Sequence, residues 1–218
     1  MVQKQIKNII FDFGGILVDL DKSRCLEAFN RLGFPEASQW IDAYCQQGIF
    51  GKLETGEITP ESFCDEVRHL TACQASDTQL WEAWNLFLAG IPQWRIEALM
   101  ELRKHYVVYL LSNTNAPHWE YACSHFFPYK GFQAEDYFEE MFLSYQLHQT
   151  KPSEDIFRTV LQRTGVVPDE TLFIDDSAAN CHTAQSLGIH TYCPAPGEDW
   201  RKVLGLTVSD NCGTNFIL

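Results

Sequence analysis

Seven residues that could do chemistry together stand in four short segments of the chain, and three of these segments directly follow an apolar stretch. They are Asp12, Gly14, Ser112, Asn113, Lys151, Asp175 and Asp176. Asp12 is the most informative of them, because apolar residues 9–11 lead directly to it and two glycines follow at positions 14 and 15. A carboxylate at the mouth of a buried strand is a candidate nucleophile or metal ligand.

The acidic residues predict a metal site. Asp175 and Asp176 are adjacent, and a third carboxylate near them would be repelled unless a hard cation lay between the groups. Carboxylate oxygens are ligands that suit Mg²⁺. Asp12 and Asp175 are therefore candidate magnesium ligands, and Asp176 is a further candidate.

The remaining polar residues predict a phosphate site beside the metal. Ser112 and the backbone amide of Asn113 precede a predicted helix, so they supply donors and the positive end of a helix dipole. Lys151 adds a compact positive charge for the phosphate oxygens or for Asp12. Asp12 could then attack phosphorus and form an aspartyl phosphate, which water would hydrolyse.

The elements that must position these groups can be predicted from the apolar pattern. Helical patterns occur at residues 94–104, 153–164 and 177–187 and separate the later of five β-rich segments, at residues 8–13, 107–112, 141–144, 172–175 and 189–192. Strands that alternate with helices are typical of an α/β fold with a parallel sheet. Because ligands bind at the carboxyl ends of such strands, we expect the four polar segments to meet at one edge.

A long helical segment interrupts this pattern. More than ninety residues separate the first two predicted strands, too many for one crossover, so a second domain is inserted there. We predict a four-helix cap domain at residues 18–91 and a core formed by residues 1–17 and 92–218. The tail at residues 209–218 could add an edge strand or act as a packing arm.

Local signals place helices within the predicted cap. Gly33 ends one helical pattern, and Thr59-Pro60 has the capping residue and first-turn proline that begin another. Residues 81–88 predict an aromatic-rich helix, in which Trp81 and Trp84 are expected in the cap core. Residues 50–58 form a glycine-bounded turn that could reach the cleft, although a structural connection is favoured.

Composition excludes several function classes. Sixteen basic and twenty-nine acidic residues give a formal net charge of −13, which disfavours binding to nucleic acid or to an anionic membrane surface. A phosphate ligand must therefore bind at a local positive focus. The eight cysteines are scattered without metal-type pairing, which predicts reduced thiols in a cytoplasmic protein. No signal peptide, membrane span or protein partner is indicated.

The order and spacing of the motifs resemble those of a known superfamily. Four segments carry the resemblance: Asp12-x-Gly14-Gly15-Ile16-Leu17, Leu110-Leu111-Ser112-Asn113, Lys151-Pro152, and Phe173-Ile174-Asp175-Asp176-x-x-x-Asn180-x-x-x-Ala184-x-x-x-Gly188. They resemble the four motifs of the haloacid dehalogenase-like hydrolases. The chain looks like the branch with a small helical cap after the first motif, and it is similar to the α-glucose-1-phosphate phosphatases.

This resemblance implies a fold, a cofactor and roles for the motif residues. The core would be Rossmann-like, and Mg²⁺ would be bound by Asp12, the backbone carbonyl of Gly14, and Asp175. Phosphate would be held by Ser112, Asn113 and Lys151. The cap would select the substrate, a small phosphorylated metabolite such as a sugar phosphate.

One position departs from most phosphatases of the superfamily. They carry a second aspartate two residues after the nucleophile as general acid and base, whereas this chain has Gly14. Loss of general acid–base catalysis typically lowers the rate by about 10²–10⁴-fold. This loss in rate is smallest for substrates with good leaving groups. The glucose-1-phosphatase branch resembles this chain in having glycine there. Asp19 or Asp21 could substitute, although both lie toward the cap hinge.

The sequence leaves two alternatives to a phosphatase open. A haloacid dehalogenase would use the same aspartate on carbon without magnesium, but Gly14 and the lack of arginine between residues 12 and 23 disfavour it. A catalytically weak protein that binds a phosphorylated metabolite and regulates another process is the second alternative. Halide release would identify the first, and tight binding without turnover would identify the second.

Overall fold

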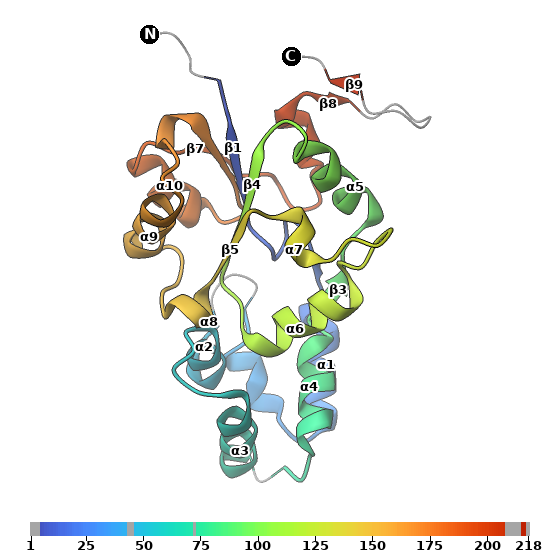
Figure 1. The fold of residues 1–218 in the computed structure, drawn as a ribbon. Helices are drawn as coiled ribbons and strands as arrows, with labels where there is room; N and C mark the ends of the chain where they lie inside the picture. Colours follow the sequence, from blue (N-terminus) through green and yellow to red (C-terminus); the bar gives the residue numbers. More distant parts are fainter. Residues whose placement is uncertain (1–4, 43–45, 72, 208–214, 217–218) are drawn as a thin grey trace.

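Five parallel strands form the central sheet of the computed structural model, which describes residues 5–42, 46–71, 73–207 and 215–216 (Figure 1). Their spatial order is β5 (Glu140–Leu143), β4 (Val107–Ser112), β1 (Asn8–Phe11), β6 (Thr171–Ile174) and β7 (His190–Tyr192). The five predicted strands are thereby confirmed, with ends displaced by at most two residues. The chain builds outward from β1 on one side and then on the other, so strand order reverses at β1. This reversal is the place where such sheets bind ligands.

Helices cover both faces of the sheet. They are α5 (Gln93–Leu102), α6 (Ala116–His125), α7 (Ala134–Tyr137), α8 (Ser144–Leu147), α9 (Glu154–Thr164), α10 (Ala178–Ser186), η2 (Pro168–Glu170) and η3 (Trp200–Leu204). The predicted helices at residues 94–104, 153–164 and 177–187 correspond to α5, α9 and α10. Ser153 caps α9 as its sequence predicts, because its hydroxyl accepts from the Asp155 amide at 3.3 Å.

The alternation of side chains along β1 explains the two layers. Ile9 and Phe11 belong to the apolar cluster shared with α5 and α6, whereas Ile10 belongs to a second cluster with α9 and α10. Successive strand residues point to opposite faces, so a strand covered on both faces is apolar throughout. Figure 1 shows α9 and α10 on one side of the sheet and α5 on the other.

The segment between β1 and α5 is mainly helical. It contains β2 (Asp19–Leu20), α1 (Lys22–Arg31), η1 (Pro35–Gln39), α2 (Gly48–Glu54), α3 (Pro60–Thr71), α4 (Asp77–Asn85) and β3 (Leu88–Gly90). We call residues 22–85 the helical insertion; it lies at the end of the sheet opposite the start of β1 (Figure 1). Its aromatic core, which includes Phe29, Phe50, Phe63 and Trp84, is continuous with the cluster on one face of the sheet.

The aromatic helix predicted over residues 81–88 is shorter in the structure. α4 ends at Asn85, and Leu88 belongs to β3, which pairs antiparallel with β2. The Asp21 amide also donates to the Phe87 carbonyl at 2.8 Å, so the chain enters and leaves the helical insertion through one short ladder. The apolar pattern alone did not distinguish the end of a helix from a short strand.

A buried arginine fixes the β2–β3 ladder to the core. Nη1 of Arg95 on α5 donates to the Leu17 carbonyl at 3.0 Å and to Asp19 Oδ1 at 2.7 Å. Arg95 is 5% exposed, so its ion pair with Asp19 is well shielded on the arginine side. The two chain segments that lead to the helical insertion are therefore held against α5.

The chain ends in a second small ladder. β8 (Leu206–Thr207) pairs antiparallel with β9 (Asn215–Phe216), so part of the tail forms a strand, while residues 208–214 and 217–218 lie outside the described residues. Among the described residues, six cysteines are free thiols, and none of the helices combines the length and apolarity needed to span a bilayer.

Candidate active site

Lys151 joins two of the predicted carboxylates at the carboxyl edge of the sheet. Its Nζ atom lies 2.7 Å from Asp12 Oδ1, 2.7 Å from Asp175 Oδ2 and 3.0 Å from the Leu111 carbonyl. An ammonium group has three donors, so all of them are engaged here. Burial lowers the pKa of Lys151, but Asp12 and Asp175 outweigh this effect and raise it to about 12. Lys151 is therefore a fixed positive charge between the ends of β1 and β6.

Asp175 is held by several donors besides Lys151. The Ser177 amide donates to Oδ1 at 2.8 Å, and Asn180 Nδ2 lies 3.0 Å from both carboxylate oxygens. Asn180 lies on the first turn of α10, so the start of this helix and the end of β6 are joined through one completely buried carboxylate. These donors fix the orientation of the Asp175 carboxylate.

Asp12, Asp175 and Asp176 form an acidic cluster in which one ligand oxygen of each lies within 4.8 Å of the others. Burial raises the pKa of Asp12 to about 8, against the opposing effect of Lys151. Burial and the charge of Asp175 raise the pKa of Asp176 to about 6. A divalent cation would offset both the burial of these carboxylates and their mutual repulsion, and three carboxylate oxygens form a donor set that suits a hard cation.

The two glycines after Asp12 have different roles. Gly15 has φ +72°, and a Cβ atom there would lie 2.2 Å from Asp176 Oδ2, so only glycine lets the turn pass under the acidic cluster. Gly14 lines the cavity, and a Cβ atom there would meet only Leu20 at 3.4 Å. The position two residues after Asp12 is therefore open to the cavity in this chain.

The segment after β4 forms the adjoining wall. Asn113 Nδ2 donates to the Lys151 carbonyl at 2.9 Å, and the Lys151 amide donates to Asn113 Oδ1 at 2.8 Å. The Asn113 side chain thus positions Lys151 and leaves its backbone amide as the group available to a ligand. Ser112 is 1% exposed, and its hydroxyl lies 3.3 Å from the Asn113 carbonyl. The N-terminus of α6, capped by Asn115, follows this wall.

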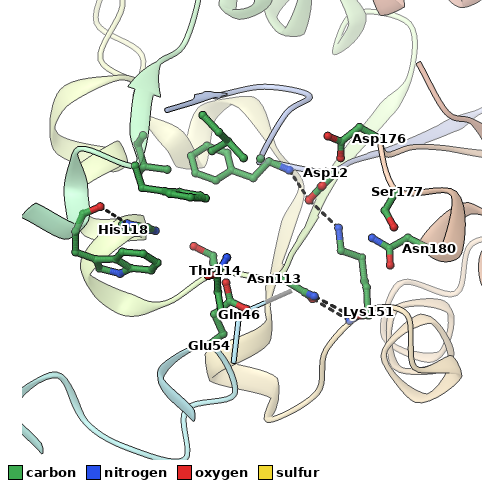
Figure 2. Close-up of a pocket in the computed structure, with 16 residues that line it drawn as sticks. Asp12, Gln46, Glu54, Asn113, Thr114, His118, Lys151, Asp176, Ser177 and Asn180 are labelled. Atoms are coloured by element: carbon green, nitrogen blue, oxygen red, sulfur yellow. Dashed lines mark hydrogen bonds and ion pairs between the residues drawn. The ribbon is translucent and has the colours of Figure 1, made fainter. Parts of the chain in front are cut away.

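These residues surround one cavity between the sheet edge and the helical insertion (Figure 2). Of the seven predicted residues, Asp12, Gly14, Asn113, Lys151 and Asp176 line it. Ser112 and Asp175 are almost fully buried and do not belong to its lining, although each is adjacent in sequence to a residue that does. Asp19 pairs with Arg95 and Asp21 caps α1, so neither of the two suggested substitutes for an aspartate at position 14 reaches the cavity.

The opposite wall comes from the helical insertion, and sequence reasoning placed none of its residues in the site. Glu54, at the end of α2, lines the cavity beside Gln46 (Figure 2). The Gln46 backbone amide donates a hydrogen bond to the Glu54 carboxyl group. Burial raises the pKa of Glu54 to about 8; Lys151 opposes this shift and Asp12 adds to it. The glycine-bounded turn at residues 50–58 was the available signal, and one of its side chains does reach the cavity.

Trp84 and His118 form the third part of the lining. The His118 ring stacks on Trp84 with centroids 4.2 Å apart, and His118 Nε2 lies 3.0 Å from the Trp84 carbonyl. Because a carbonyl only accepts, Nε2 carries the proton. Burial lowers the pKa of His118 to about 4, so the ring is neutral near pH 7. Trp84 is completely buried, as expected for a core residue.

Comparisons with known proteins agree with this geometry. A family model described as haloacid dehalogenase-like hydrolase matches residues 6–188. The D-ribitol-5-phosphate phosphatase of Bacteroides thetaiotaomicron is 40% identical over 199 residues, which cover 91% of this chain and 97% of that protein.

Solved structures show the same similarity. A haloacid dehalogenase family enzyme from Bacteroides thetaiotaomicron, in complex with magnesium and inorganic phosphate, superimposes with a TM-score of 0.86 at 46% identity over 91% of this chain and 98% of that one. A predicted hydrolase of the same family from Porphyromonas gingivalis gives a TM-score of 0.85 at 35% identity over 92% of this chain and 96% of that one.

Proposed function

This chain belongs to the haloacid dehalogenase-like hydrolases, and from that membership we propose that it is a Mg²⁺-dependent phosphatase of a small phosphorylated metabolite, a sugar or sugar-alcohol phosphate. The observation that carries the proposal is the acidic cluster of Asp12, Asp175 and Asp176, with Lys151 between two of its members. The relative that hydrolyses D-ribitol 5-phosphate and the related structure with magnesium and phosphate support the substrate class and the cofactor.

Asp12 is the proposed nucleophile. Its carboxylate is anchored by Lys151 at 2.7 Å and by the Phe13 amide, which donates to Oδ1 at 2.7 Å. These donors restrict the rotation of the carboxylate, which leaves Oδ2 as the attacking atom. Attack on phosphorus expels the alcohol and forms an aspartyl phosphate, which water then hydrolyses.

Asp12, Asp175 and Asp176 would hold Mg²⁺, with the Gly14 carbonyl as a further proposed ligand. The bound ion would draw charge from the phosphate oxygens as a Lewis acid. The Asn113 backbone amide, Ser112 and the charge of Lys151 are the proposed phosphate-binding groups. Because the net charge of the chain is −13, this local positive focus is what makes an anionic substrate acceptable.

The proposed cap domain is residues 18–91, which contain the helical insertion. It supplies one wall of the cavity, so side chains from it contact any group attached to the phosphate. We therefore assign substrate selection to this wall. Reduced cysteines and a cytoplasmic location remain part of the proposal.

The test is phosphate release with and without Mg²⁺ from D-ribitol 5-phosphate, hexose 1- and 6-phosphates, acetyl phosphate and p-nitrophenyl phosphate. We expect release that needs both Mg²⁺ and Asp12, with the Asp12→Asn variant inactive and still folded. More than a few per cent of activity in that variant would remove Asp12 as nucleophile. Halide release from a 2-haloacid without Mg²⁺, or tight phosphate binding without turnover on the whole panel, would overturn the phosphatase.

A further inference from the structure

The proposed reaction needs a proton donor that Gly14 cannot provide. An alkoxide leaving group is a poor one, and protonation by a positioned acid typically contributes about 10²–10⁴-fold in rate. Among the described residues that line the cavity, five can titrate: Asp12, Glu54, His118, Lys151 and Asp176. The acid must come from this group or from solvent.

Four of the five are committed to other contacts. Asp12 and Asp176 belong to the acidic cluster, and Lys151 has its three donors engaged. His118 donates its one ring proton to the Trp84 carbonyl. Glu54 remains, with a carboxyl group that accepts from the Gln46 amide and has a second oxygen to carry a proton.

Glu54 lies across the cavity from Asp12, and in-line chemistry would place the leaving group on that side. When Asp12 attacks phosphorus, the leaving oxygen departs on the opposite side, and the water that later attacks the aspartyl phosphate arrives from that same side. Figure 2 shows Asp12 beside Asp176 at the sheet edge and Glu54 beside Gln46 across the cavity. A single carboxyl group on the insertion side can therefore serve both half-reactions.

The core holds the end of α2 tightly. Ser144 Oγ on α8 lies 2.7 Å from the Glu54 carbonyl and accepts from the Thr114 amide at 2.9 Å. His148 Nδ1 lies 2.9 Å from the Thr55 carbonyl. Through these contacts the backbone that carries Glu54 is tied to the segment that follows Ser112 and Asn113, so the acid and the phosphate wall are positioned together.

Charge balance favours a proton on Glu54 when substrate is bound. The three carboxylates of the acidic cluster offset the charges of one divalent cation and Lys151, so a bound phosphate ester brings uncompensated negative charge. An ionised Glu54 would add to it at short range and in a poorly solvated cavity. Burial already raises the pKa of Glu54 to about 8 without substrate.

We propose that Glu54 is the general acid and base of this enzyme, in the place of the aspartate that Gly14 lacks; this inference rests on the proposed phosphatase function. In the first step Asp12 forms a bond to phosphorus, the bond from phosphorus to the leaving oxygen breaks, and the Glu54 proton passes to that oxygen. In the second step the Glu54 carboxylate takes a proton from water, whose oxygen bonds to phosphorus while the bond to Asp12 breaks. Phosphate is released, and Glu54 again carries its proton.

The test compares Glu54→Gln with the wild type on two leaving groups. For D-ribitol 5-phosphate we expect kcat/KM to fall about 10²-fold or more, because an alkoxide needs protonation. For p-nitrophenyl phosphate we expect kcat/KM to stay within about fivefold, since p-nitrophenolate leaves unaided. Loss of the base slows the second step, so a burst of one p-nitrophenolate per active site should precede slow turnover.

Controls separate this role from a structural one. Glutamine keeps the shape of Glu54 and its capacity to accept from Gln46, and equal melting temperatures would show that the fold is intact. Glu57→Gln changes an exposed carboxyl group three residues further along and should leave both substrates unaffected. Glu54→Asp, which keeps a carboxyl group, should recover part of the activity on D-ribitol 5-phosphate.

The pH profile is a second, independent readout. The charged groups that act on Glu54 are Lys151, which lowers its pKa, and Asp12, which raises it; α8 and His148 contact only the backbone of this segment. Activity of the wild type on D-ribitol 5-phosphate should fall as Glu54 loses its proton at alkaline pH, and the Glu54→Gln variant should lack this fall.

The failure of this inference is distinct from failure of the proposed function. Equal losses on both substrates without a burst, or no loss on either in a wild type that is an Asp12-dependent phosphatase, would overturn the role of Glu54 alone. A wild type that releases no phosphate from either substrate would overturn the phosphatase and this inference with it.

Discussion

The two sides of the cavity are built from different kinds of interaction. On the sheet side, Asp12, Lys151 and Asp175 are charged groups that follow strands or their connections, and they hold one another at 2.7 Å. On the insertion side, Glu54 is next to a backbone amide, and Trp84 stacks on the neutral ring of His118, which comes from α6 of the core. The sheet side therefore depends on charge balance, and the insertion side depends on packing and on keeping its titratable groups neutral.

This difference follows from how each side is positioned. β1 pairs in register with β4 and β6, so the ends of neighbouring strands are fixed relative to one another by a continuous ladder. Among its described residues the helical insertion has no ladder to the central sheet, since β2 and β3 pair with each other, and α2 is placed by contacts with α8. Charged groups can be kept close together on a rigid ladder. Substitutions in a wall that is placed by packing could change the preferred substrate without moving those charged groups.

The largest expected effect comes from removing the positive charge on the sheet side. Lys151→Met keeps the apolar stem but leaves Asp12 and Asp175 without a counter-charge, and loss of one partner of a buried pair costs about 3–5 kcal/mol. We expect this decrease in the free energy of unfolding in urea without divalent cation, a partial recovery with Mg²⁺, and almost complete loss of turnover. The exposed Lys52→Met is the control and should change stability by less than about 0.5 kcal/mol. An unchanged stability for Lys151→Met would mean that charge balance does not hold this side.

The next effect is a pH dependence of stability that originates where His118 of α6 packs against Trp84 of the insertion side. The pKa of His118 is lowered from 6.5 to about 4. As the pH falls, the unfolded chain therefore binds a proton on this histidine at a higher pH than the folded chain does. The stabilisation is fully present above pH 6.5 and is lost as the pH falls toward 4, to the extent of about 3 kcal/mol. Unfolding in urea at pH 7 and pH 4.5 measures it.

His118→Phe isolates this contribution, because phenylalanine retains a ring that can stack on Trp84 but does not titrate. The acidic residues with raised pKa values respond to pH in the opposite direction in both proteins, so the difference between wild type and variant is the quantity of interest. Equal pH dependence in the two proteins would mean that His118 is protonated in the fold.

The sequence could predict that the sheet-side carboxylates lie together, because strand order and motif position contain the necessary information. Asp12 and Asp175 directly follow apolar strands, and parallel strands bring their carboxyl ends to one edge. Glu54 could not be placed in the same way, since the orientation of α2 depends on contacts with α8 that are 90 residues away in sequence. The wrong assignment of residues 86–88 to a helix has a similar cause, because residues 86–87 form a turn and Leu88 enters a strand that exists only through pairing with β2.

A smaller effect is expected where α2 meets the core. Gly56 has φ +68°, and a Cβ atom there would lie 2.2 Å from the Tyr145 carbonyl. Gly165 has φ +67° with nothing within 4 Å, so Gly165→Ala measures the backbone strain alone, about 1–2 kcal/mol. Gly56→Ala should cost about 1–3 kcal/mol more, because the backbone must move. Displacement of Glu54 should also lower kcat/KM on D-ribitol 5-phosphate. Equal stability and activity of the two variants would mean that this contact does not position α2.

The smallest expected effect tests whether an acid on the sheet side can replace the one on the insertion side. Gly14 does not have a positive φ, and a Cβ atom would be in ordinary contact with Leu20 at 3.4 Å, so Gly14→Asp is sterically acceptable. In the wild type we expect less than about a tenfold gain in kcat/KM on D-ribitol 5-phosphate, because Glu54 already supplies the proton. In the Glu54→Gln background the gain should be larger, and a double-mutant cycle measures the difference. Equal gains in both backgrounds would show that the two acids act independently, and a gain near 10²-fold in the wild type would mean that no acid serves the leaving group at present.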